Sequence, residues 1–286
     1  MKLPQHLQFD TFDACNLTCA DCYTHNPEAA KMFQPSIMPL STIERLLGQT
    51  KDLTLLSIRP FGYGEPMLET RMPKIIDIIR KYNKAEIVLY TNGTIYENRR
   101  LLAHPEIAEV HFTISANTPQ TYQLVHGKPL LSQAVRTISW LEKQSPHPRI
   151  VLNFVINRMN VHELEQWKQR WQGYEQVRSK LHRNYRDKYS VDLVLLSEEG
   201  VDANLHGGVH YGMPCSAWSN CYVDARGDYQ LCCHGIPEEI TFGNVLDTPL
   251  LEAWRKRCEN QMQNRMCETC TFRVDGWKER LERYES

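Results

Sequence analysis

The chain has 286 residues, 42% of them hydrophobic and 23% charged, so it can form one large domain with a sizeable core, with or without a small appendage. Its formal net charge of −1 excludes a general electrostatic footprint for nucleic acid or for an acidic membrane surface. Because no run of about 18 apolar residues predicts a transmembrane helix and the first residues contain no apolar signal region, we expect a cytoplasmic chain without a membrane partner.

The ten cysteines are unevenly distributed along the chain. Three lie at or before Cys22, and the other seven lie between Cys215 and Cys270. Since the cytoplasm keeps thiols reduced, metal or redox chemistry explains these cysteines better than disulfides do. The distribution predicts two metal-binding regions, and we expect a first domain over residues 1–200 and a second over 201–286.

The first predicted element is a strand at Leu7–Phe12, and a cysteine loop follows it. Cys15, Cys19 and Cys22 have the spacing C-x3-C-x2-C. A structural zinc site needs four closed ligands. Three thiolates instead ligate three irons of a [4Fe–4S] cluster and leave the fourth open, because each iron needs its own ligand. The spacing therefore indicates an incomplete and reactive metal site.

This loop closely resembles the cluster loop of the radical S-adenosylmethionine (radical SAM) enzymes over the segment Cys15-Asn-Leu-Thr-Cys19-Ala-Asp-Cys22-Tyr. In that family the open iron is chelated by the amino and carboxylate groups of SAM. The resemblance implies that the three cysteines hold a SAM-binding [4Fe–4S] cluster. Relatives commonly have an aromatic residue where this chain has Asp21, so the adenine contact is expected to differ here.

Strand-like and helix-like stretches then alternate through the cysteine-free part of the chain. The predicted strands are short, apolar and end in small or polar residues: Leu7–Phe12, Leu53–Phe61, Ala85–Thr91, Val110–Ser115, Ile150–Asn157 and Val191–Leu196. The predicted helices have apolar residues three and four apart: Thr42–Gln49, Met72–Tyr82, Leu130–Lys143 and Val161–Trp171. This alternation predicts parallel strands with right-handed crossovers, in a partial barrel or a doubly wound open sheet. In either fold, chemistry collects at the C-terminal strand ends.

A glycine-containing turn, Phe61-Gly62-Tyr63-Gly64-Glu65-Pro66, follows the second predicted strand. Glycine lets the backbone approach a ligand closely and proline stiffens the turn, but a plain strand-to-helix turn also explains the hexapeptide. Beside the cysteine loop it is similar to the family's Gly-Gly-Glu-Pro motif, which binds the SAM ammonium, with Tyr63 replacing one glycine. The resemblance implies cofactor contacts from Gly64 and Glu65.

Polar residues also end the next three predicted strands. Asn92 lies in a sequence similar to the family's Thr-Asn-Gly turn. Ser115 and Asn117 end the fourth strand, where relatives place hydroxyl or amide groups on the SAM ribose and carboxylate. Asn153 and Arg158 lie on or just after the fifth, where polar groups often meet SAM. The resemblance implies cofactor contacts at all five positions, and ordinary hydrogen-bonded strand ends are the alternative.

The second cysteine-rich region begins near Met213. A Gly-Asp turn at Gly227-Asp228 between strand-like flanks predicts a hairpin that bears Cys232. Cys267-x2-Cys270 further along is a compact metal-binding turn. On spacing alone, two such pairs would equally form a zinc ribbon with four cysteine ligands.

The region resembles the SPASM/Twitch extension of radical SAM enzymes in its C-x11-G-x4-C spacing, in Phe242-Gly243-Asn244-Val245 and in its final cysteine pair. A full SPASM module continues with further cysteines and binds two auxiliary clusters, whereas this chain has none after Cys270. The shortened Twitch form holds one. The resemblance implies one auxiliary [4Fe–4S] cluster, with the ligands Cys215, Cys232, Cys267 and Cys270.

Three cysteines remain outside both ligand sets: Cys221, Cys233 and Cys258. A free cysteine is usually a small buried hydrophobe, but an S–H is also a good hydrogen-atom donor to a carbon radical. Some relatives that epimerise amino acids or sugars use a cysteine in this way. Cys221 and Cys233 are therefore candidate hydrogen donors, although full SPASM modules use the cysteine at the Cys221 offset as a ligand.

The histidines and the basic segment carry no assigned role. His25, His111 and His126 lie near predicted strand ends or loops, but a lone histidine is more often a satisfied polar residue than a ligand or a base. The locally basic stretch 178–188 is expected to be a solvated helix face rather than a phosphate, peptide or RNA contact.

The expected fold is α/β, with the barrel taken from the resemblance: a partial (β/α)6 TIM-like barrel followed by a small Cys-rich β-hairpin/helix module of SPASM/Twitch type. The implied chemistry is reductive cleavage of SAM to a 5′-deoxyadenosyl radical that abstracts hydrogen from the substrate. An electron donor such as flavodoxin or ferredoxin is the implied protein partner.

The fate of the substrate radical defines the reaction. An auxiliary cluster that accepts the second electron gives net oxidation of a small polar metabolite, such as a sugar, aminocyclitol or nucleoside. A cysteine donor would instead give an epimerase, and a peptide-modifying enzyme is a further alternative. Only 14 residues precede Cys15, whereas many peptide-modifying relatives begin with a separate peptide-binding domain. A zinc-stabilised binding protein is the non-enzymatic alternative.

Overall fold

A computed structural model describes residues 2–20, 22, 36–180, 215, 217–233 and 240–261, in which nine strands form one mixed sheet. In chain order the strands are β1 (His6–Phe9), β2 (Ser57–Arg59), β3 (Glu86–Thr91), β4 (Ile107–Thr113), β5 (Arg149–Ile156), β6 (Glu175–Lys180), β7 (Asn220–Val223), β8 (Asp228–Gln230) and β9 (Thr241–Asn244). Their spatial order is β6-β5-β4-β3-β2-β1-β7-β8-β9. All pairs from β6 to β7 are parallel, and the last two pairs are antiparallel.

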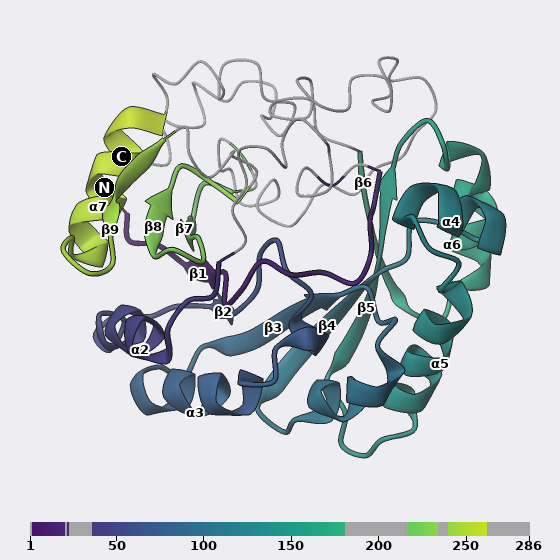
Figure 1. Cartoon of the computed structure of the whole chain (residues 1–286), viewed down its shortest axis with the longest axis horizontal. Helices are drawn as coiled ribbons and strands as arrows, with labels where there is room; N and C mark the ends of the chain where they lie inside the picture. The colour runs from purple at the N-terminus through teal and green to yellow at the C-terminus, as the bar shows by residue number, and fades with distance from the viewer. Residues whose placement is uncertain are drawn as a thin grey trace.

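Helices connect the parallel strands, and α2, α3 and α5 lie along the outer side of the curved sheet (Figure 1). The α-helices are α2 (Leu40–Gly48), α3 (Met72–Tyr82), α4 (Pro119–His126), α5 (Leu131–Glu142), α6 (Leu164–Arg170) and α7 (Leu250–Gln261). Short 3₁₀ helices span Pro66–Leu68, Tyr96–Ala103 and Val161–Glu163. In α3, Ile75, Ile76 and Ile79 recur at helical spacing and are fully buried, which fixes the helix against the sheet.

The sheet has one apolar face and one polar face, because side chains alternate along each strand. Leu7, Ile58, Leu89, Phe112 and Leu152 belong to the buried apolar core beneath the helices. The opposite side of the same strands, which we call the polar face, carries the apolar side chains Val88, Val151 and Val155. It is otherwise formed mainly by polar side chains: His6, Gln8, Ser57, Arg59, Tyr90, Glu109, His111, Arg149, Asn153, Asn220 and Tyr222. Branched apolar side chains usually fill a TIM barrel, so the polar face is built like the wall of a binding site.

The structure confirms the α/β fold with parallel strands joined by helices, and α3 has the predicted bounds. The first five strands lie within a few residues of their predicted positions. The hairpin predicted at Gly227-Asp228 is also confirmed, because β7 and β8 pair antiparallel around Gly227, whose φ is +88°. The predicted strand Val191–Leu196 lies outside the described residues, and β6 is a parallel strand that the sequence pattern did not reveal.

The sequence pattern also missed α4, which is short and carries little apolar periodicity. Its caps nevertheless account for it. The Thr118 side chain accepts a hydrogen bond from the Thr121 amide, Pro119 pre-sets the first turn, and Gly127 ends the helix with a φ of +78°. The capping signals therefore locate a helix that hydrophobic periodicity does not show.

One sheet runs through both predicted domains, since β1 pairs with β7 from His6 opposite Asn220 to Phe9 opposite Val223. The predicted boundary near residue 200 lies outside the described residues and stays a prediction. The hairpin of β7 and β8 thus lies directly beside the first strand, at the edge from which the cysteine loop emerges.

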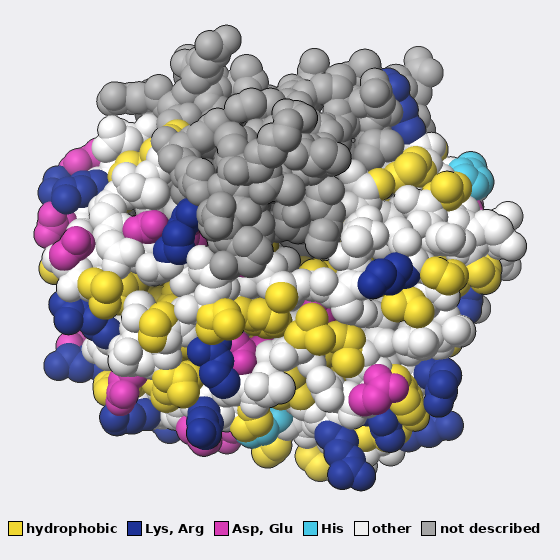
Figure 2. Space-filling model, viewed as in Figure 1, with side chains coloured by type: hydrophobic (Ala, Val, Ile, Leu, Met, Phe, Trp, Pro, Cys, Tyr) yellow, Lys and Arg dark blue, Asp and Glu magenta, His cyan; other side chains and the backbone are white. Residues whose placement is uncertain are grey.

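Within the part of the chain that the structure describes, no helix is long and apolar enough to cross a membrane. Lysine and arginine side chains are interspersed with acidic ones around the face shown in Figure 2 rather than gathered into one patch. This distribution agrees with the formal net charge of −1.

Candidate functional site

The loop with Cys15, Cys19 and Cys22 emerges from the C-terminal end of β1, and all three side chains are partly exposed. Two N–H groups approach the Cys15 sulfur: the Leu17 amide at 3.5 Å and the Asn92 carboxamide nitrogen at 3.8 Å. Burial raises the pKa of Cys15 to about 11. Its thiol therefore stays protonated at neutral pH unless a cation such as iron binds the sulfur.

Asn92, which follows β3, connects this strand end to the cysteine loop. Its carboxamide nitrogen donates to Asn16 Oδ1 at 2.9 Å, and its oxygen accepts from the Thr94 amide at 2.9 Å. Asn16 in turn donates to Thr94 Oγ1 at 2.8 Å. The predicted cofactor residue Asn92 is thus already engaged in positioning the loop, and its contact with SAM stays a prediction.

The turn between β2 and α3 packs directly on the start of the cysteine loop. A Cβ on Gly64 would lie 2.2 Å from the Phe12 carbonyl oxygen, and one on Gly62 would lie 1.4 Å from Asp10 Oδ1. The Glu65 amide donates to the Ala14 carbonyl at 2.9 Å. Close packing alone therefore requires both glycines, which is the structural alternative to the predicted cofactor contact of Gly64.

Glu65 is buried, and its carboxylate holds the end of β3. Oε1 accepts from Thr91 Oγ1 at 2.6 Å and from the Met67 amide at 2.9 Å, and Oε2 accepts from the Asn92 amide at 2.8 Å. Burial raises the pKa of Glu65 to about 6 although these hydrogen bonds oppose the shift. A carboxylate with three protein donors keeps one further acceptor position, so a bond to the SAM ammonium stays a prediction.

The end of β4 is fixed by Glu163, a residue that the sequence reading did not single out. Its carboxylate accepts from the Asn117 amide at 2.5 Å, from Thr118 Oγ1 at 2.5 Å and from Thr121 Oγ1 at 2.8 Å. Burial alone would raise the pKa of Glu163, but these bonds outweigh it and lower the pKa. The ionised side chain thereby orders the segment that leads into α4.

Ser115 and Asn117, the predicted residues at the end of β4, differ in whether their side chains can still accept a hydrogen bond from a ligand. Ser115 Oγ accepts from the Val155 amide at 3.0 Å, so this hydroxyl is part of the β4–β5 contact. Asn117 Oδ1 is buried and has no hydrogen-bond partner among the described residues. Asn117 is therefore the better placed of the two for a ligand.

The two predicted residues of β5 lie in different surroundings. Asn153 is on the polar face, where Oδ1 lies 3.3 Å from His111 Nδ1 and Nδ2 is buried without a partner in the described part of the chain. Arg158 is exposed in the turn after the strand. The structure thus brings Asn153, but not Arg158, onto the wall formed by the sheet.

Side-chain contacts run across the polar face from strand to strand. His6 Nδ1 lies 2.8 Å from Ser57 Oγ, and Asn220 Nδ2 donates to Gln8 Oε1 at 3.0 Å. The Tyr90 ring stacks on His111 at 4.0 Å between centroids. Asn220 Oδ1 has no partner among the described residues. The face is thus a connected polar surface that still has unused hydrogen-bonding groups.

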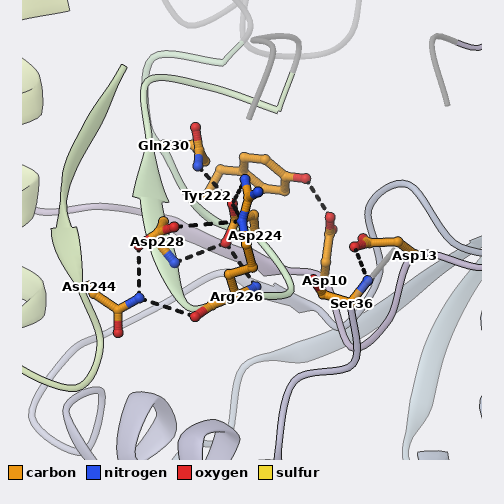
Figure 3. Close-up of polar contacts among 9 residues, drawn as sticks. All are labelled: Asp10, Asp13, Ser36, Tyr222, Asp224, Arg226, Asp228, Gln230 and Asn244. Atoms are coloured by element: carbon orange, nitrogen blue, oxygen red, sulfur yellow. Dashed lines mark hydrogen bonds and ion pairs between the residues drawn. The ribbon is translucent and has the colours of Figure 1, made fainter. Parts of the chain in front are cut away.

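Carboxyl groups gather where β1 meets the β7–β8 hairpin (Figure 3). Tyr222 donates to Asp10 Oδ2 at 2.8 Å, and Asp13 accepts from the Ser36 amide at 3.0 Å. Burial, followed by the charge of Asp13, raises the pKa of Asp10 well above its ordinary value. Burial also raises the pKa of Asp13 to about 6. The raised pKa favours the protonated form of Asp10, in which its carboxyl group can donate a hydrogen bond to Asp13.

Asp224, which follows β7, is the third carboxyl group of this cluster and lies in the turn of the β7–β8 hairpin. Its Oδ1 accepts from the Asp228 amide at 2.9 Å, and its Oδ2 accepts from Gln230 Nε2 at 2.9 Å and pairs with Arg226 at 3.0 Å (Figure 3). These bonds hold the tight turn of the hairpin. The turn of the hairpin is consequently fixed beside the end of β1, and Cys232 follows β8 at the opposite end of these strands.

In the second cysteine region, Arg257 of α7 joins the segments around Cys215 and Cys232. Its guanidinium is buried and donates to the carbonyls of Leu231 at 2.9 Å, Trp218 at 2.6 Å and Ala217 at 2.9 Å. Burial raises the pKa of Cys215 to about 11, and the charge of Arg257 opposes this shift. The sequence reading missed Arg257, and the other two predicted ligands, Cys267 and Cys270, lie outside the described residues.

The two candidate hydrogen donors differ in where they lie relative to the polar face. Cys221 pairs with Leu7 and is buried in the apolar core beside α7. Cys233 lies within electrostatic reach of Arg59 and Tyr90, which belong to the polar face. Cys221 thus faces away from the polar face and Cys233 lies near it, and the hydrogen-donor role of each stays a prediction.

The sulfur environment fits an iron–sulfur cluster. Among the described residues, no group of three or more His, Cys, Asp or Glu side chains is arranged to hold a single metal ion. A cluster takes one thiolate on each of several irons, so its ligands need not surround one point. The N–H donors at Cys15 and the guanidinium beside Cys215 both suit anionic sulfur.

Comparison with known proteins agrees with this arrangement. Residues 215–271 match the SPASM family, an iron–sulfur cluster-binding domain. The chain is 21% identical over 159 residues to the 7,8-dihydro-6-hydroxymethylpterin dimethyltransferase of Methanocaldococcus jannaschii. It is 26% identical over 168 residues to the probable GTP 3',8-cyclase of Methanothermobacter thermautotrophicus. These alignments cover 54% and 58% of this chain but only 31% and 51% of the relatives, so the chain spans about half of their length or less.

Solved structures share the fold at low sequence identity. BtrN in complex with AdoMet and 2-DOIA aligns over 94% of both chains, with a TM-score of 0.59 and 14% identity. The anSMEcpe structure with bound AdoMet aligns over 90% of this chain and 82% of its own, with a TM-score of 0.67 and 15% identity. Streptococcus suis SuiB bound to the precursor peptide SuiA aligns over 95% and 70%, with a TM-score of 0.66 and 14% identity. These likenesses show the TIM-like barrel fold of radical SAM proteins.

Proposed function

We propose that this chain, a radical SAM protein with a C-terminal SPASM domain, is an oxidoreductase that removes two hydrogens from a small polar metabolite such as a sugar, aminocyclitol or nucleoside. The observation that carries the proposal is the polar face, which adjoins the cysteine loop and contains buried hydrogen-bonding atoms that no described residue uses. A substrate rich in hydroxyl or amine groups would satisfy those atoms.

The proposed cofactor site lies at the C-terminal ends of β1 to β5. Cys15, Cys19 and Cys22 would hold a [4Fe–4S] cluster, with SAM on its open iron. When bound, the cluster supplies the electron that breaks SAM and starts hydrogen abstraction, and the auxiliary cluster takes up the electron that the substrate radical gives up. An external donor such as flavodoxin or ferredoxin would supply the first electron.

The SAM-facing groups are proposed from the strand ends. Gly64 and Glu65 lie against the cysteine loop, and Asn117 presents a buried oxygen that no described residue bonds. Asn92 and Ser115 already make hydrogen bonds within the protein, so they would position the walls of the site rather than bind SAM strongly themselves. Asn153 lies on the polar face and would meet substrate or SAM, whereas the exposed Arg158 would need an ionic ligand group to reach it.

The charge beside the second cysteine set supports net oxidation. Cys215, Cys232, Cys267 and Cys270 would hold the auxiliary cluster, and the Arg257 guanidinium lies beside Cys215. A nearby positive charge favours the more negative, reduced state of a cluster and so raises its reduction potential. This arrangement suits an electron acceptor. The substrate would lose one hydrogen atom to the SAM-derived radical, one electron to the acceptor and one proton to a base or to solvent.

The relatives also include small-molecule enzymes. Two of the names quoted above specify GTP and a hydroxymethylpterin, and BtrN, whose solved complex contains 2-DOIA, has the same overall extent as this chain. The peptide complexes of SuiB and anSMEcpe support a second candidate function, modification of a peptide. The unused hydrogen-bonding atoms of the polar face support the small polar metabolite.

Cys233 supports an epimerase as the remaining alternative. Cys233 is partly exposed and lies near polar-face residues. Desolvation of its thiol raises the pKa to about 12, so it carries the hydrogen that a donor must transfer. Return of that hydrogen atom to the opposite side of the substrate radical would invert the carbon centre and leave a thiyl radical. Such an enzyme would need a reductant to restore the thiol.

The decisive experiment incubates the reconstituted protein anaerobically with SAM, dithionite and candidate sugars, aminocyclitols, nucleosides and peptides in heavy water. Mass spectrometry should find a small-molecule product two mass units lighter, without deuterium at carbon. Deuterium fixed at carbon would instead identify an exchangeable donor and an epimerase, and turnover of peptides alone would identify a peptide-modifying enzyme. A colourless protein with stoichiometric zinc would refute the catalytic proposal.

A further inference from the structure

His126, the last residue of α4, contacts the cysteine loop although sequence reasoning gave it no role. Its Nδ1 lies 3.3 Å from the Cys19 sulfur, and its Nε2 lies 3.2 Å from the Ser115 amide nitrogen. The side chain is buried, with 4% of its surface exposed, and its ring packs on Tyr122 at 4.3 Å between centroids. One imidazole therefore joins a predicted cluster ligand to the end of β4.

The backbone fixes which ring nitrogen carries the proton. The Ser115 amide can only donate, so Nε2 must accept with its lone pair. In a neutral imidazole the proton then resides on Nδ1. Nδ1–H points at Cys19, so the short contact is an N–H···S hydrogen bond from His126 to the sulfur. No change of protonation state is needed for this bond.

The end of α4 holds the ring in this position. The amides of Thr18 and Ala20 in the cysteine loop donate to the carbonyls of His126 at 3.3 Å and Val125 at 2.9 Å, which are unpaired ends of the helix ladder. A Cβ on Gly127 would lie 2.0 Å from Thr18 Oγ1. The loop and the helix end are therefore packed at backbone distance, which keeps the imidazole close to Cys19.

We propose that His126 is a positioning residue that sets the reduction potential of the cluster on Cys15, Cys19 and Cys22. The inference rests on the proposed function, because it requires that this cluster forms. An N–H donor to a ligating sulfur withdraws charge from it and favours the reduced state. Removing the donor should consequently lower the reduction potential of the cluster. At a given potential, less of the cluster would then be in the reduced state that passes an electron to SAM.

Two substitutions separate the sulfur contact from the contact with β4. His126→Asn places an amide nitrogen near the position of Nδ1 and can keep the donor to Cys19. His126→Gln places its carboxamide near the position of Nε2, so it can accept from the Ser115 amide but loses the N–H directed at sulfur. A merely structural role of the β4 contact would be rescued by Gln and not by Asn.

The test is a redox titration of the full-length holoprotein followed by electron paramagnetic resonance, with the first cluster identified by the change of its signal on adding SAM. At the potential that half-reduces the wild-type cluster, we expect the reduced-to-oxidised ratio in His126→Gln to fall about tenfold, equivalent to ~59 mV for one electron. His126→Asn should stay within about twofold of wild type. An unshifted His126→Gln, or a shift in Asn but not in Gln, would overturn the inference.

Iron analysis and a second spectroscopic readout keep this result separate from the proposed function. Absence of a SAM-responsive cluster in the wild type would refute the proposed function itself. If the cluster does not assemble in His126→Gln, the wild-type protein is labelled with ¹⁵N-histidine. The couplings between the electron spin of its reduced cluster and the ¹⁵N nuclei are then measured. A coupling to one histidine is expected, and its absence in a SAM-responsive cluster would refute the hydrogen bond while leaving the function intact.

Discussion

The two cysteine regions are supported by different kinds of donor. At the N-terminal loop, the Cys15 and Cys19 sulfurs face neutral N–H groups from Leu17, Asn92 and His126. In the C-terminal region, the buried Arg257 guanidinium lies beside Cys215 and binds three carbonyls around it. Neutral donors adjust a cluster potential modestly, whereas a fixed positive charge shifts it further toward the reduced state.

This difference predicts the direction of electron transfer between the two regions. A cluster whose sulfurs contact neutral N–H groups keeps the low potential needed to pass an electron into SAM, and a cluster beside a guanidinium is the better acceptor. In the proposed reaction, electrons enter at the loop after β1 and leave the substrate toward the hairpin of β7 and β8. Because β1 and β7 are parallel and β8 returns antiparallel, the loop after β1 and the Cys215 and Cys232 segments lie at opposite ends of these strands.

The largest effect should come from removing the first ligand set. In the Cys15→Ala/Cys19→Ala/Cys22→Ala protein we expect loss of roughly half of about eight irons and complete loss of SAM cleavage, because no thiolate remains for the first cluster. Iron analysis and a chromatographic assay of 5′-deoxyadenosine measure this. Cys258→Ala, outside both ligand sets, is the control. Surviving SAM cleavage in the triple variant would show that the site assignment is wrong.

Replacing the guanidinium tests the second region. Arg257→Met leaves the carbonyls of Ala217, Trp218 and Leu231 without their donor. We expect the free energy of unfolding of the cluster-free protein to fall by about 3 kcal/mol and the auxiliary cluster iron to be lost, while SAM-responsive signal from the first cluster remains. Chemical denaturation and iron analysis measure the two effects.

Arg255→Met provides the matched control on the same helix. Arg255 is half exposed and pairs with Glu259 at 2.8 Å across one turn of α7. Since exposed pairs contribute little, its removal should change the free energy of unfolding by less than about 0.5 kcal/mol. Equal effects at the two arginines would remove the basis for the comparison between the regions.

The packing of the β2–α3 turn on the cysteine loop can be tested with one methyl group. In Gly64→Ala the new Cβ would meet the Phe12 carbonyl oxygen at 2.2 Å. We expect the free energy of unfolding to fall by about 1–3 kcal/mol and SAM cleavage to slow, because the loop must shift. Gly173→Ala meets nothing within 4 Å and should be neutral or stabilising by about 0.4–1 kcal/mol. Normal SAM cleavage in Gly64→Ala would show that the β2–α3 turn is not needed to form the cofactor site.

The sequence predicted the features that depend on local pattern. The cysteine spacing and the strand–helix alternation gave the fold class, and the bounds of α3 follow from isoleucines at helical spacing. The hairpin follows from Gly227-Asp228, where the backbone needs a positive φ. These features are encoded within a few consecutive residues, so one sequence is enough to find them.

The groups that support the sulfurs depend on long-range contacts instead. His126 lies 107 residues from Cys19, and Arg257 lies 26 to 40 residues from the carbonyls that it binds. No periodicity connects such positions before the fold brings them together. The sequence pattern likewise does not distinguish Cys221 from Cys233. Only the pairing of β7 with β1 places Cys221 on the apolar face, whereas Cys233 lies near Arg59 and Tyr90.

The smallest predicted effect concerns Glu163, which orders the segment leading to α4 and so supports the N-terminal loop indirectly. Hydrogen bonds from Thr118, Asn117 and Thr121 hold the pKa of Glu163 below its ordinary 4.5 against the opposing effect of burial. A carboxylate with a lowered folded-state pKa stabilises the protein above its unfolded-state pKa, and that contribution is lost as the pH falls through the folded-state value.

Glu163→Gln should therefore lower the free energy of unfolding by about 1–2 kcal/mol at neutral pH. In acid the gap to wild type should close below the ordinary pKa of 4.5, as urea unfolding of the cluster-free proteins across this range would measure. A gap that stays constant into acid would mean that the Glu163 contacts do not depend on its charge, and α4 would then be held by its caps alone.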